Sequence, residues 1–298
     1  MSQMNLENKI EAYLKELDVD LKVLIEQNKN ELLFDINSFL FAKAKRIRPI
    51  FTYLCSYLCD FEPNADVKKI GLALELLHSA TLIHDDILDE SPKRRGLDSF
   101  YSKFGTKLAL IAGDYLLSLS LLVLSEIENK NVVKIFSKNI ISTVNGEINQ
   151  MKSLFEVKSE KEYFQKCLEK TGNLFVCAAQ SVCEVLSQDE EKANKIVDFA
   201  KDFGVSFQIK NDIENFSNPK SDDLKNGIYT LCTIYFKHEN PNCDIINIEK
   251  ADKQKCITKA NLKLDEIIQN AKSKLLLIET KNPFAKEALV ALCDKLKG

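Results

Sequence analysis

Glycine and proline are scarce in this sequence, and tryptophan is absent. Only 9 Gly and 6 Pro occur among 298 residues, where average usage would give about 20 and about 15. Sharp turns are therefore few, which favours long helices. The net charge of −3 lacks the basic excess of a general nucleic-acid-binding protein, so we expect no nucleic-acid partner.

Long apolar runs are missing as well. No uninterrupted run reaches the roughly 18 residues of a transmembrane helix, so we expect no transmembrane segment. The N-terminus, MSQMNLENKIEAYLKEL, is amphipathic and acidic and does not resemble a signal peptide. The nine cysteines form no CxxC pair and stand mostly among Leu, Val and Ala. They predict buried thiols in a reducing, cytoplasmic compartment rather than zinc ligands.

What the sequence does contain is helical periodicity along its whole length. Apolar residues recur at spacings of three and four, with no internal repeat and no Pro/Gly/Ser linker. We therefore predict a single all-α domain spanning residues 1–298. Residues 66–89 are apolar nearly all round until their end, which is typical of a buried central helix. The predicted helices span 5–27, 30–42, 49–60, 66–89, 106–127, 131–153, 160–186, 189–216, 221–237 and 252–296.

Three aspartates, Asp85, Asp86 and Asp89, stand at the end of this central helix. On a helix, residues i and i+4 share a face, so Asp85 and Asp89 point the same way. Like charges so placed repel each other, and a cation would relieve the repulsion. Mg²⁺ prefers hard oxygen ligands and commonly shares them with a phosphate group. The spacing therefore favours a Mg²⁺ and phosphate site, and the alternative is a solvated acidic helix end.

A basic segment follows at once, Lys93-Arg94-Arg95-Gly96 after Pro92. Arginine binds phosphate through two parallel hydrogen bonds, which suits a diphosphate beside Mg²⁺. The alternative is a loop that only balances the acidic charge. The combined pattern would have no function only if both of these alternatives were true.

The two patterns together resemble the first aspartate-rich motif of trans-polyprenyl diphosphate synthases, DDxxD followed after four residues by RRG. The chain is most similar to the long-chain, octaprenyl diphosphate synthase-like members. Further blocks fall in family order: Lys45-Arg46-Ile47-Arg48-Pro49, with Lys43-Ala44 where glycines are usual, then the segment around His78, Gly113-Asp114, Gly146-Glu147-x-x-Gln150, Lys170-Thr171 and Phe207-Gln208.

The resemblance implies an isoprenoid-synthase-type helical bundle around a central apolar cavity. It also implies a Mg²⁺-dependent prenyltransferase that condenses an allylic diphosphate with isopentenyl diphosphate. Two to three Mg²⁺ ions would neutralise the departing diphosphate. The apolar chamber would exclude water from the carbocation.

The resemblance also assigns residue roles. Asp85, Asp86 and Asp89 would bind Mg²⁺. Catalysis would involve Lys170, Thr171 and Gln208. The substrate-binding residues would be Lys45, Arg48, His78 and Arg95 for isopentenyl diphosphate, Arg94 and Lys170 for the allylic diphosphate, and Gln208 between them.

The second aspartate-rich motif departs from the family pattern, because Asn211 and Asn215 replace its first and last aspartates. Asparagine keeps an oxygen ligand but loses the charge, so we predict Asn211 to be a weak Mg²⁺ ligand. Ile228 replaces a lysine further on, and Lys210 and Lys225 are nearby substitutes.

Three functional hypotheses follow from this departure. The first is an active synthase that tolerates a weaker second metal site. The second is a non-catalytic or regulatory subunit of a heteromeric prenyl diphosphate synthase. A helical terpene cyclase is less well supported, because Lys45, Arg48 and Arg95 would then have no purpose.

Two small residues, Ala80 and Thr81, lie about one helical turn, roughly 6 Å, before Asp85. Their small side chains would leave the product tunnel open. We therefore predict a product of about C30–C40 for quinone side chains. The alternative is that Ala80 only permits close helix packing. We also expect a homodimer, formed through helices that include Gly113-Asp114 and Leu116–Leu124. A transient membrane contact would serve product release.

Overall fold

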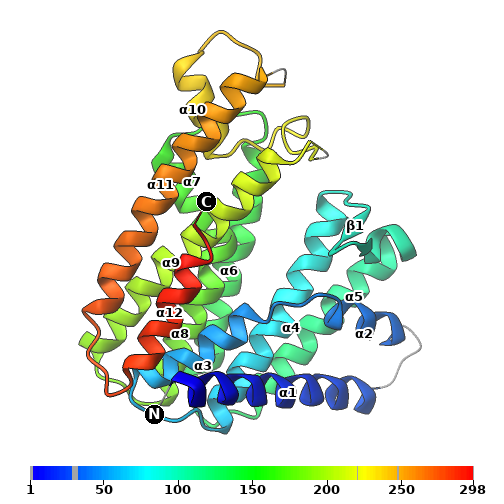
Figure 1. Cartoon of the computed structure of the whole chain (residues 1–298). Helices are drawn as coiled ribbons and strands as arrows, with labels where there is room; N and C mark the ends of the chain where they lie inside the picture. The colour runs from blue at the N-terminus through cyan, green and yellow to red at the C-terminus, as the bar shows by residue number, and fades with distance from the viewer. Residues whose placement is uncertain (1–2, 29–32, 220, 247, 298) are drawn as a thin grey trace. The chain divides into compact units, whose positions relative to one another are not determined.

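The computed structural model describes residues 3–28, 33–219, 221–246 and 248–297. Helices dominate this part of the chain, and its strands are confined to one short hairpin (Figure 1). The all-α prediction is therefore confirmed. The chain divides into two compact units, which are Met1–Lys134 with Ser181–Gln188 and Ile135–Gln180 with Asp189–Gly298. The single-domain prediction stays a prediction.

The first unit is organised around a long buried helix, α4. An N-cap begins this helix, since the Asn64 side chain accepts a hydrogen bond from the Val67 N–H. Helices α3 and α5 pack against α4, and most of its apolar residues are buried, as predicted. The elements of the unit are α1 (Gln3–Gln27), α2 (Leu33–Phe41), α3 (Ile47–Leu58), α4 (Ala65–Leu88), β1 (Lys93–Arg94), β2 (Leu97–Asp98) and α5 (Phe100–Ser125).

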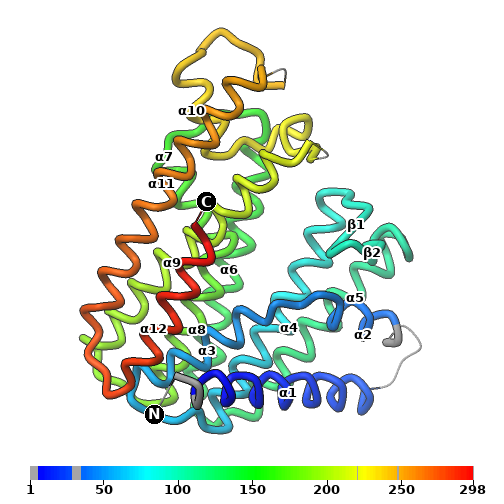
Figure 2. Tube along the Cα trace, viewed as in Figure 1, coloured from blue at the N-terminus to red at the C-terminus, as the bar shows by residue number. Residues whose placement is uncertain are grey.

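The second unit consists of helices joined by loops, and Figure 2 traces their path. Within it, α9 packs against α11 and against a short π-helix, η1. The first residues of α6 and the last residues of α8 belong to the first unit. The elements of the second unit are α6 (Asn131–Lys152), α7 (Glu160–Cys167), η1 (Leu168–Gly172), α8 (Asn173–Val185), α9 (Glu190–Ser217), α10 (Leu231–Glu239), α11 (Lys250–Leu276) and α12 (Pro283–Asp294).

The structure corrects three of the predicted helices. The helix predicted over 221–237 begins only at Leu231, because Gly227 at φ 74° holds a loop open before it. The helix predicted over 160–186 is interrupted by η1. The helix predicted over 252–296 is two helices, and Pro283 starts the second of them. Residues 30–32 of the predicted helix 30–42 lie outside the described residues.

Helix α5 is longer and more apolar than the prediction allowed. Gly105 has a non-helical φ of 76° and separates the first turn from the rest of the helix. The regular helix therefore begins near residue 106, as the periodicity predicted. By length and composition alone, it is the one helix in the described residues that could cross a membrane. Polar residues such as Lys107 and Asp114 interrupt its sequence, which is why no uninterrupted run was found. A partly buried core helix meets the same criterion, so this finding is weak support for a membrane span.

All nine cysteines are free thiols, and eight of them are buried. The exception is Cys243, which is exposed. Burial raises the pKa of several of these thiols, among them Cys55 and Cys167. The prediction of small buried hydrophobic residues is therefore confirmed for eight of the nine.

Candidate active site

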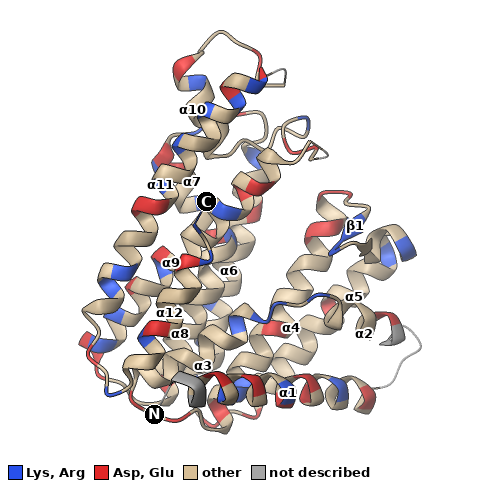
Figure 3. Cartoon of the chain, viewed as in Figure 1, with Lys and Arg blue, Asp and Glu red and all other residues tan. Residues whose placement is uncertain are grey.

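The aspartate-rich motif occupies the carboxyl end of α4, where Figure 3 shows acidic residues beside the basic strand β1. The Asp89 N–H donates to the Asp85 carbonyl at 2.8 Å. This bond extends helical geometry to Asp89, so Asp85 and Asp89 share a face as predicted. Three acidic side chains at a helix C-terminus are electrostatically unfavourable, because that end already carries partial negative charge. The motif is therefore a place where a cation would be stabilising.

Asp86 differs from its two neighbours because it is fully buried. Its Oδ1 accepts hydrogen bonds from Arg94 Nε at 2.8 Å and from Arg94 Nη2. Burial raises the pKa of Asp86, and the Arg94 guanidinium opposes that rise. The predicted contact of Arg94 with an allylic diphosphate stays a prediction, and Asp86 is a partner that the sequence did not indicate.

The hairpin explains how Arg94 reaches Asp86. Strands β1 and β2 pair with Arg94 opposite Leu97, so only Arg95 and Gly96 form the turn. Their φ values are 53° and 84°, as a type I′ turn requires. Glycine adopts this conformation easily, whereas arginine does so only at some energetic cost. The tight turn folds β1 back toward the end of α4.

The residues of the motif fit a Mg²⁺ ion that is shared with a substrate. Nowhere in the described chain do three His, Cys, Asp or Glu side chains form a group that could hold a metal by themselves. Asp86 Oδ2 is buried and has no hydrogen-bond partner among the described residues. Mg²⁺ commonly uses one or two carboxylates and completes its shell with water and phosphate oxygens. Asp85 and Asp89 can supply those carboxylates, with Asp86 behind them.

A buried ion pair anchors the loop that leads into α3. Arg46 donates to Glu75 Oε1 at 2.6 Å and to Asp18 Oδ1 at 2.9 Å. Glu75 is almost completely buried in the middle of α4, where an unpaired carboxylate would be very costly. The pairing holds Arg48 in the first turn of α3, buried near the same carboxylate.

Arg48 and Arg95 form a positively charged cluster near Glu75, and His78 lies close to both of them. Burial lowers the pKa of Arg48 to about 10, and Glu75 opposes this effect. Burial also lowers the pKa of His78 well below its usual range, and the charges of Arg48 and Arg95 add to that effect. His78 is therefore neutral at pH 7 and can still donate one hydrogen bond. Lys45 lies on the exposed surface of the same loop. Such a cluster suits an anionic ligand.

In the second unit, Lys170 and Thr171 lie in the π-helix η1. Single π-turns inside α-helices are frequent at functional sites. Lys170 Nζ forms an ion pair with Glu147 Oε1 at 2.9 Å. A Cβ placed on Gly204 would lie only 2.5 Å from the Cα of Gly172. The backbones of η1 and α9 are therefore in direct contact.

This contact supports a buried chain of hydrogen bonds. The Thr171 hydroxyl donates to Gln208 Oε1, and Gln208 Nε2 donates to Asp212 Oδ1 at 2.7 Å. The Tyr163 hydroxyl donates to Asp212 Oδ2 at 2.7 Å. Each carboxylate oxygen of Asp212 thus has a donor. An ionised carboxylate only accepts, so Asp212 turns the amide nitrogen of Gln208 toward itself and the amide oxygen toward Thr171.

The substituted positions of the second motif lie on the outer side of α9. Asn211 is half-buried and Asn215 is exposed. Asp223, from the following loop, lies near this motif, where burial raises its pKa and the charge of Asp212 adds to that rise. The role of Asn211 as a weak metal ligand stays a prediction.

The two residues predicted to control chain length are placed without being tested. Ala80 is buried, with 2% of its surface exposed. The Thr81 hydroxyl donates to the His78 carbonyl at 2.8 Å. Burial of Ala80 agrees with close helix packing and with a tunnel wall alike, and its role in chain length stays a prediction.

The structure thus groups the predicted residues by unit. The first unit brings together Arg48, His78, Arg94 and Arg95, and the second brings together Lys170, Thr171 and Gln208. Sequence reasoning assigned no role to the partners that position them: Glu75, Glu147, Tyr163 and Asp212. Glu147 and Asp212 stand within recognised motifs, and Glu75 is an isolated carboxylate in an apolar helix, whereas Tyr163 left no signal.

Comparison with known proteins places this arrangement in a family. The polyprenyl synthetase family profile matches residues 30–266. Solanesyl diphosphate synthase 2, chloroplastic, from Arabidopsis thaliana is 32% identical over 243 residues, which cover 76% of this chain and 58% of that protein. Heptaprenyl diphosphate synthase component 2 from Bacillus subtilis is 31% identical over 202 residues, covering 65% of this chain and 58% of that protein.

The fold is shared with solved structures. The crystal structure of heptaprenyl diphosphate synthase from Staphylococcus aureus matches with a TM-score of 0.84 and 25% identity, and covers 99% of this chain and 98% of that one. The matched segment spans little more than half of the two curated relatives above. The profile match and the sequence identity agree with the motifs on α4, η1 and α9, and this chain belongs to the polyprenyl synthetase family.

Proposed function

We propose that this chain is a Mg²⁺-dependent prenyltransferase that condenses an allylic diphosphate with isopentenyl diphosphate into a long-chain all-trans polyprenyl diphosphate. The observation that carries the proposal is the presence, within one unit, of both the acidic end of α4 and the cationic cluster of Arg48 and Arg95 beside neutral His78. One feature suits a metal-bound diphosphate, and the other suits a second anionic substrate. Relatives named as solanesyl and heptaprenyl diphosphate synthases support the same activity.

The proposed roles follow from the charges of these residues. Mg²⁺, two to three ions when bound, supplies the charge that stabilises the departing diphosphate. Asp85 and Asp89 hold the ion, while Asp86 keeps the adjoining Arg94 in place. Lys170 adds positive charge to the same diphosphate. The arginines of the cluster and neutral His78 hold isopentenyl diphosphate, with Lys45 at the exposed edge.

The reaction joins two carbon skeletons. The allylic C–O bond breaks, the double bond of isopentenyl diphosphate attacks the resulting carbocation, and a proton leaves to the departing diphosphate. Thr171 and Gln208 form a fixed polar pair because Asp212 sets the amide orientation of Gln208. We infer that this pair orients the groups between which the proton moves.

The proposal is tested by incubating the purified chain alone with Mg²⁺, farnesyl diphosphate and labelled isopentenyl diphosphate. We expect elongation to long-chain products that depends on Mg²⁺ and stops with a chelator. Absence of elongation across a broad range of Mg²⁺ concentration would contradict the proposal.

Product length is tested separately at Ala80. Because Ala80 lies about one turn before Asp85, a phenylalanine there should block the growing tail and shift products from about C30–C40 to about C15–C20. Thin-layer chromatography of the dephosphorylated products measures the shift, with Ala73→Phe as a more distant comparison on α4. An unchanged distribution would mean that the tail runs elsewhere and that Ala80 serves only helix packing.

A regulatory subunit of a heteromeric synthase is the second candidate. Two observations favour it, namely the loss of ligand charge at Asn211, Asn215 and Ile228 and the similarity to a protein named as a component 2. A chain that is inactive alone but gains elongation activity when a second chain is added would establish this alternative.

We further propose a cytoplasmic homodimer that makes a transient membrane contact to release its product for quinone side chains. Part of the predicted interface on α5 is exposed, since Leu121 and Leu122 each keep 44% of their surface, whereas Leu116 and Leu124 are buried. Sedimentation of the purified chain measures the oligomeric state directly.

A further inference from the structure

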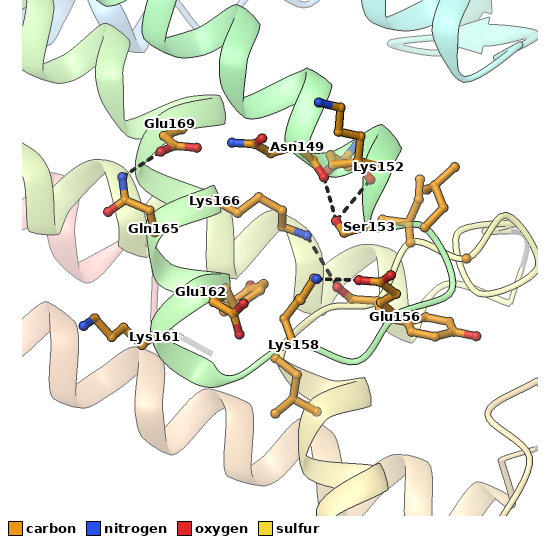
Figure 4. A pocket seen from close by; sticks show the side chains of 17 residues that line it. Asn149, Lys152, Ser153, Glu156, Lys158, Lys161, Glu162, Gln165, Lys166 and Glu169 are labelled. Atoms are coloured by element: carbon orange, nitrogen blue, oxygen red, sulfur yellow. Dashed lines mark hydrogen bonds and ion pairs between the residues drawn. The ribbon is translucent and has the colours of Figure 1, made fainter.

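The carboxyl end of α6, helix α7 and the loop before α10 enclose a pocket of about 600 Å³ within the second unit (Figure 4). Ile228 lines this pocket together with Gly227, Tyr229 and Gln150. In the family pattern a lysine stands at position 228. The pocket is therefore where that lysine's charge would be expected, and the side chain present there is apolar.

A different lysine brings positive charge to this place. Lys166 of α7 is half-buried, and its Nζ donates to the Tyr229 carbonyl at 3.4 Å, one residue from Ile228. The ammonium also lies 5.3 Å from the ring centroid of Tyr163. Burial raises the pKa of Asp212, and among the groups that oppose this rise Lys166 is the strongest. The charge of Lys166 is thus felt at the second aspartate-rich motif.

The acidic residues of the pocket are already engaged. Glu156 pairs with Lys158, Glu162 accepts from Ser159 in a capping box, and Glu169 accepts from Gln165 at 2.7 Å. In the described part of the chain, Lys166 forms no ion pair within 4 Å, and its interaction with the Asp212 carboxylate acts over a longer distance. A carbonyl at 3.4 Å and an aromatic ring compensate a positive charge only weakly, so an anion entering the pocket would gain a charge-assisted hydrogen bond.

The two lysines suggested by the sequence, Lys210 and Lys225, have other partners outside this pocket. Lys210 Nζ donates to the Lys297 carbonyl at 3.3 Å and lies 3.7 Å from Glu214 Oε1. Lys225 pairs with Asp222 and keeps 71% of its side chain exposed. Neither of them lines the pocket.

We propose that Lys166 binds the diphosphate group of the allylic substrate in this pocket and replaces, from α7, the charge that Ile228 lacks. Lys170, which the family resemblance assigns to the same diphosphate, lies four residues further on in η1 but does not itself line the pocket. The proposal rests on the proposed prenyltransferase function and adds a substrate-binding residue that the family pattern does not contain.

The first test compares Lys166→Ala with Lys161→Ala. Both lysines lie on α7 and line the pocket, but the ammonium of Lys161 points away from Lys166 in Figure 4. Loss of one charge-assisted hydrogen bond should weaken binding of farnesyl thiolodiphosphate with Mg²⁺ by about 10- to 100-fold. Isothermal titration calorimetry measures this affinity directly. Lys161→Ala should bind like the unmodified chain, and the KM for isopentenyl diphosphate should stay unchanged in both variants.

The second test moves the charge back to the family position. Adding Ile228→Lys to Lys166→Ala should restore most of the lost affinity, because the two ammonium groups would occupy neighbouring space. Lys166→Gln keeps most of the aliphatic side chain but removes its charge, so it guards against a packing effect and should bind as weakly as Lys166→Ala. Equal affinity of Lys166→Ala and the unmodified chain would overturn the proposal, as would a double variant no better than Lys166→Ala.

The outcomes also separate this proposal from the proposed function. An unmodified chain that elongates farnesyl diphosphate, together with a Lys166→Ala variant of normal affinity, contradicts only the role of Lys166. An unmodified chain that neither binds the thiolodiphosphate nor elongates the substrate contradicts both.

Discussion

The aspartate-rich segment of α4 and its counterpart on α9 have a buried aspartate at the second position in common. They differ in the residues at their outer positions. Asp86 is buried and accepts two hydrogen bonds from Arg94. Asp212 is buried and accepts from Tyr163 and Gln208. In both segments, therefore, the second aspartate is an internal anchor that positions a neighbouring side chain.

The outer positions carry the difference. They are Asp85 and Asp89 on α4, but Asn211 and Asn215 on α9. On α9 the uncharged residues stand at the half-buried and exposed outer positions, where Asn215 forms a side-chain hydrogen bond with Asp223, and the buried anchor keeps its carboxylate. Replacing an anchor would leave its donors unpaired, which costs more than neutralising an outer position. We therefore expect the second motif to be the weaker metal site, whereas its buried Asp212 keeps the structural function of an anchor.

The largest effect is expected when α4 is made to resemble α9. Asp85→Asn combined with Asp89→Asn should lower kcat for elongation by about 100- to 1,000-fold, because preorganised charge at the departing group is lost. Steady-state assays with labelled isopentenyl diphosphate measure the change. The neighbouring exposed acid provides a control, since Glu90→Gln should alter kcat less than twofold. A mild effect of the double variant would mean that α4 does not hold the metal.

A second effect concerns His78, which lies among positive charges in the first unit, and the pH dependence of the free energy of unfolding. The pKa of His78 lies well below 6.5 in the folded protein, so the unfolded chain binds a proton that the folded chain rejects. Stability should therefore fall as pH drops below 6.5, by about 1.4 kcal/mol per pH unit until the folded-state pKa is reached. His78→Gln should lack this contribution. Urea unfolding at pH 7 and pH 5 measures it, and parallel losses in both proteins would contradict the prediction.

A smaller effect is expected from weakening the anchor on α9. Tyr163→Phe removes one of the two donors to Asp212 and should cost about 1–2 kcal/mol in the free energy of unfolding. Because Gln208 keeps its own bond to Asp212, kcat should fall less than fivefold. Tyr101→Phe, in the first unit, is the matched control. A Tyr163→Phe variant as stable as the control would show that Asp212 does not need both donors.

The smallest effect is expected when α9 is restored toward α4. Asn211→Asp should lower the Mg²⁺ concentration for half-maximal activity by about two- to fivefold, as expected for one added exposed charge. Asn218→Asp, just beyond the helix, should leave it unchanged. An identical Mg²⁺ requirement in Asn211→Asp would indicate that position 211 does not contact the metal.

The sequence predicted most of the helices because their periodicity is strong and local. It failed where a backbone conformation, rather than a pattern, decides the structure. Gly227 at φ 74° holds a loop where periodicity indicated a helix, and the π-turn at Leu168–Gly172 has no periodic signature. The hairpin at Lys93–Asp98 was likewise missed, because each of its strands has only two residues.

The charged residues of the candidate site were predicted by motif, but their partners were not. Tyr163 and Asp212 are 49 positions apart in sequence, and Arg46 and Glu75 are 29 apart. Such pairs depend on how helices pack, and neither residue type nor spacing indicates which distant residues meet. For the same reason the sequence suggested Lys210 and Lys225 near position 228, whereas the structure brings Lys166 there.

The contact between Gly172 and Gly204 gives the two helices that carry Thr171 and Gln208 a fixed minimum separation. Two backbones already touch there, so η1 and α9 cannot approach each other more closely at this point. A single methyl group at Gly204 could only force them apart. Such a variant would keep the side chains of Thr171 and Gln208 and should still lose the proposed activity, so any redesign of the chain should leave both glycines unchanged.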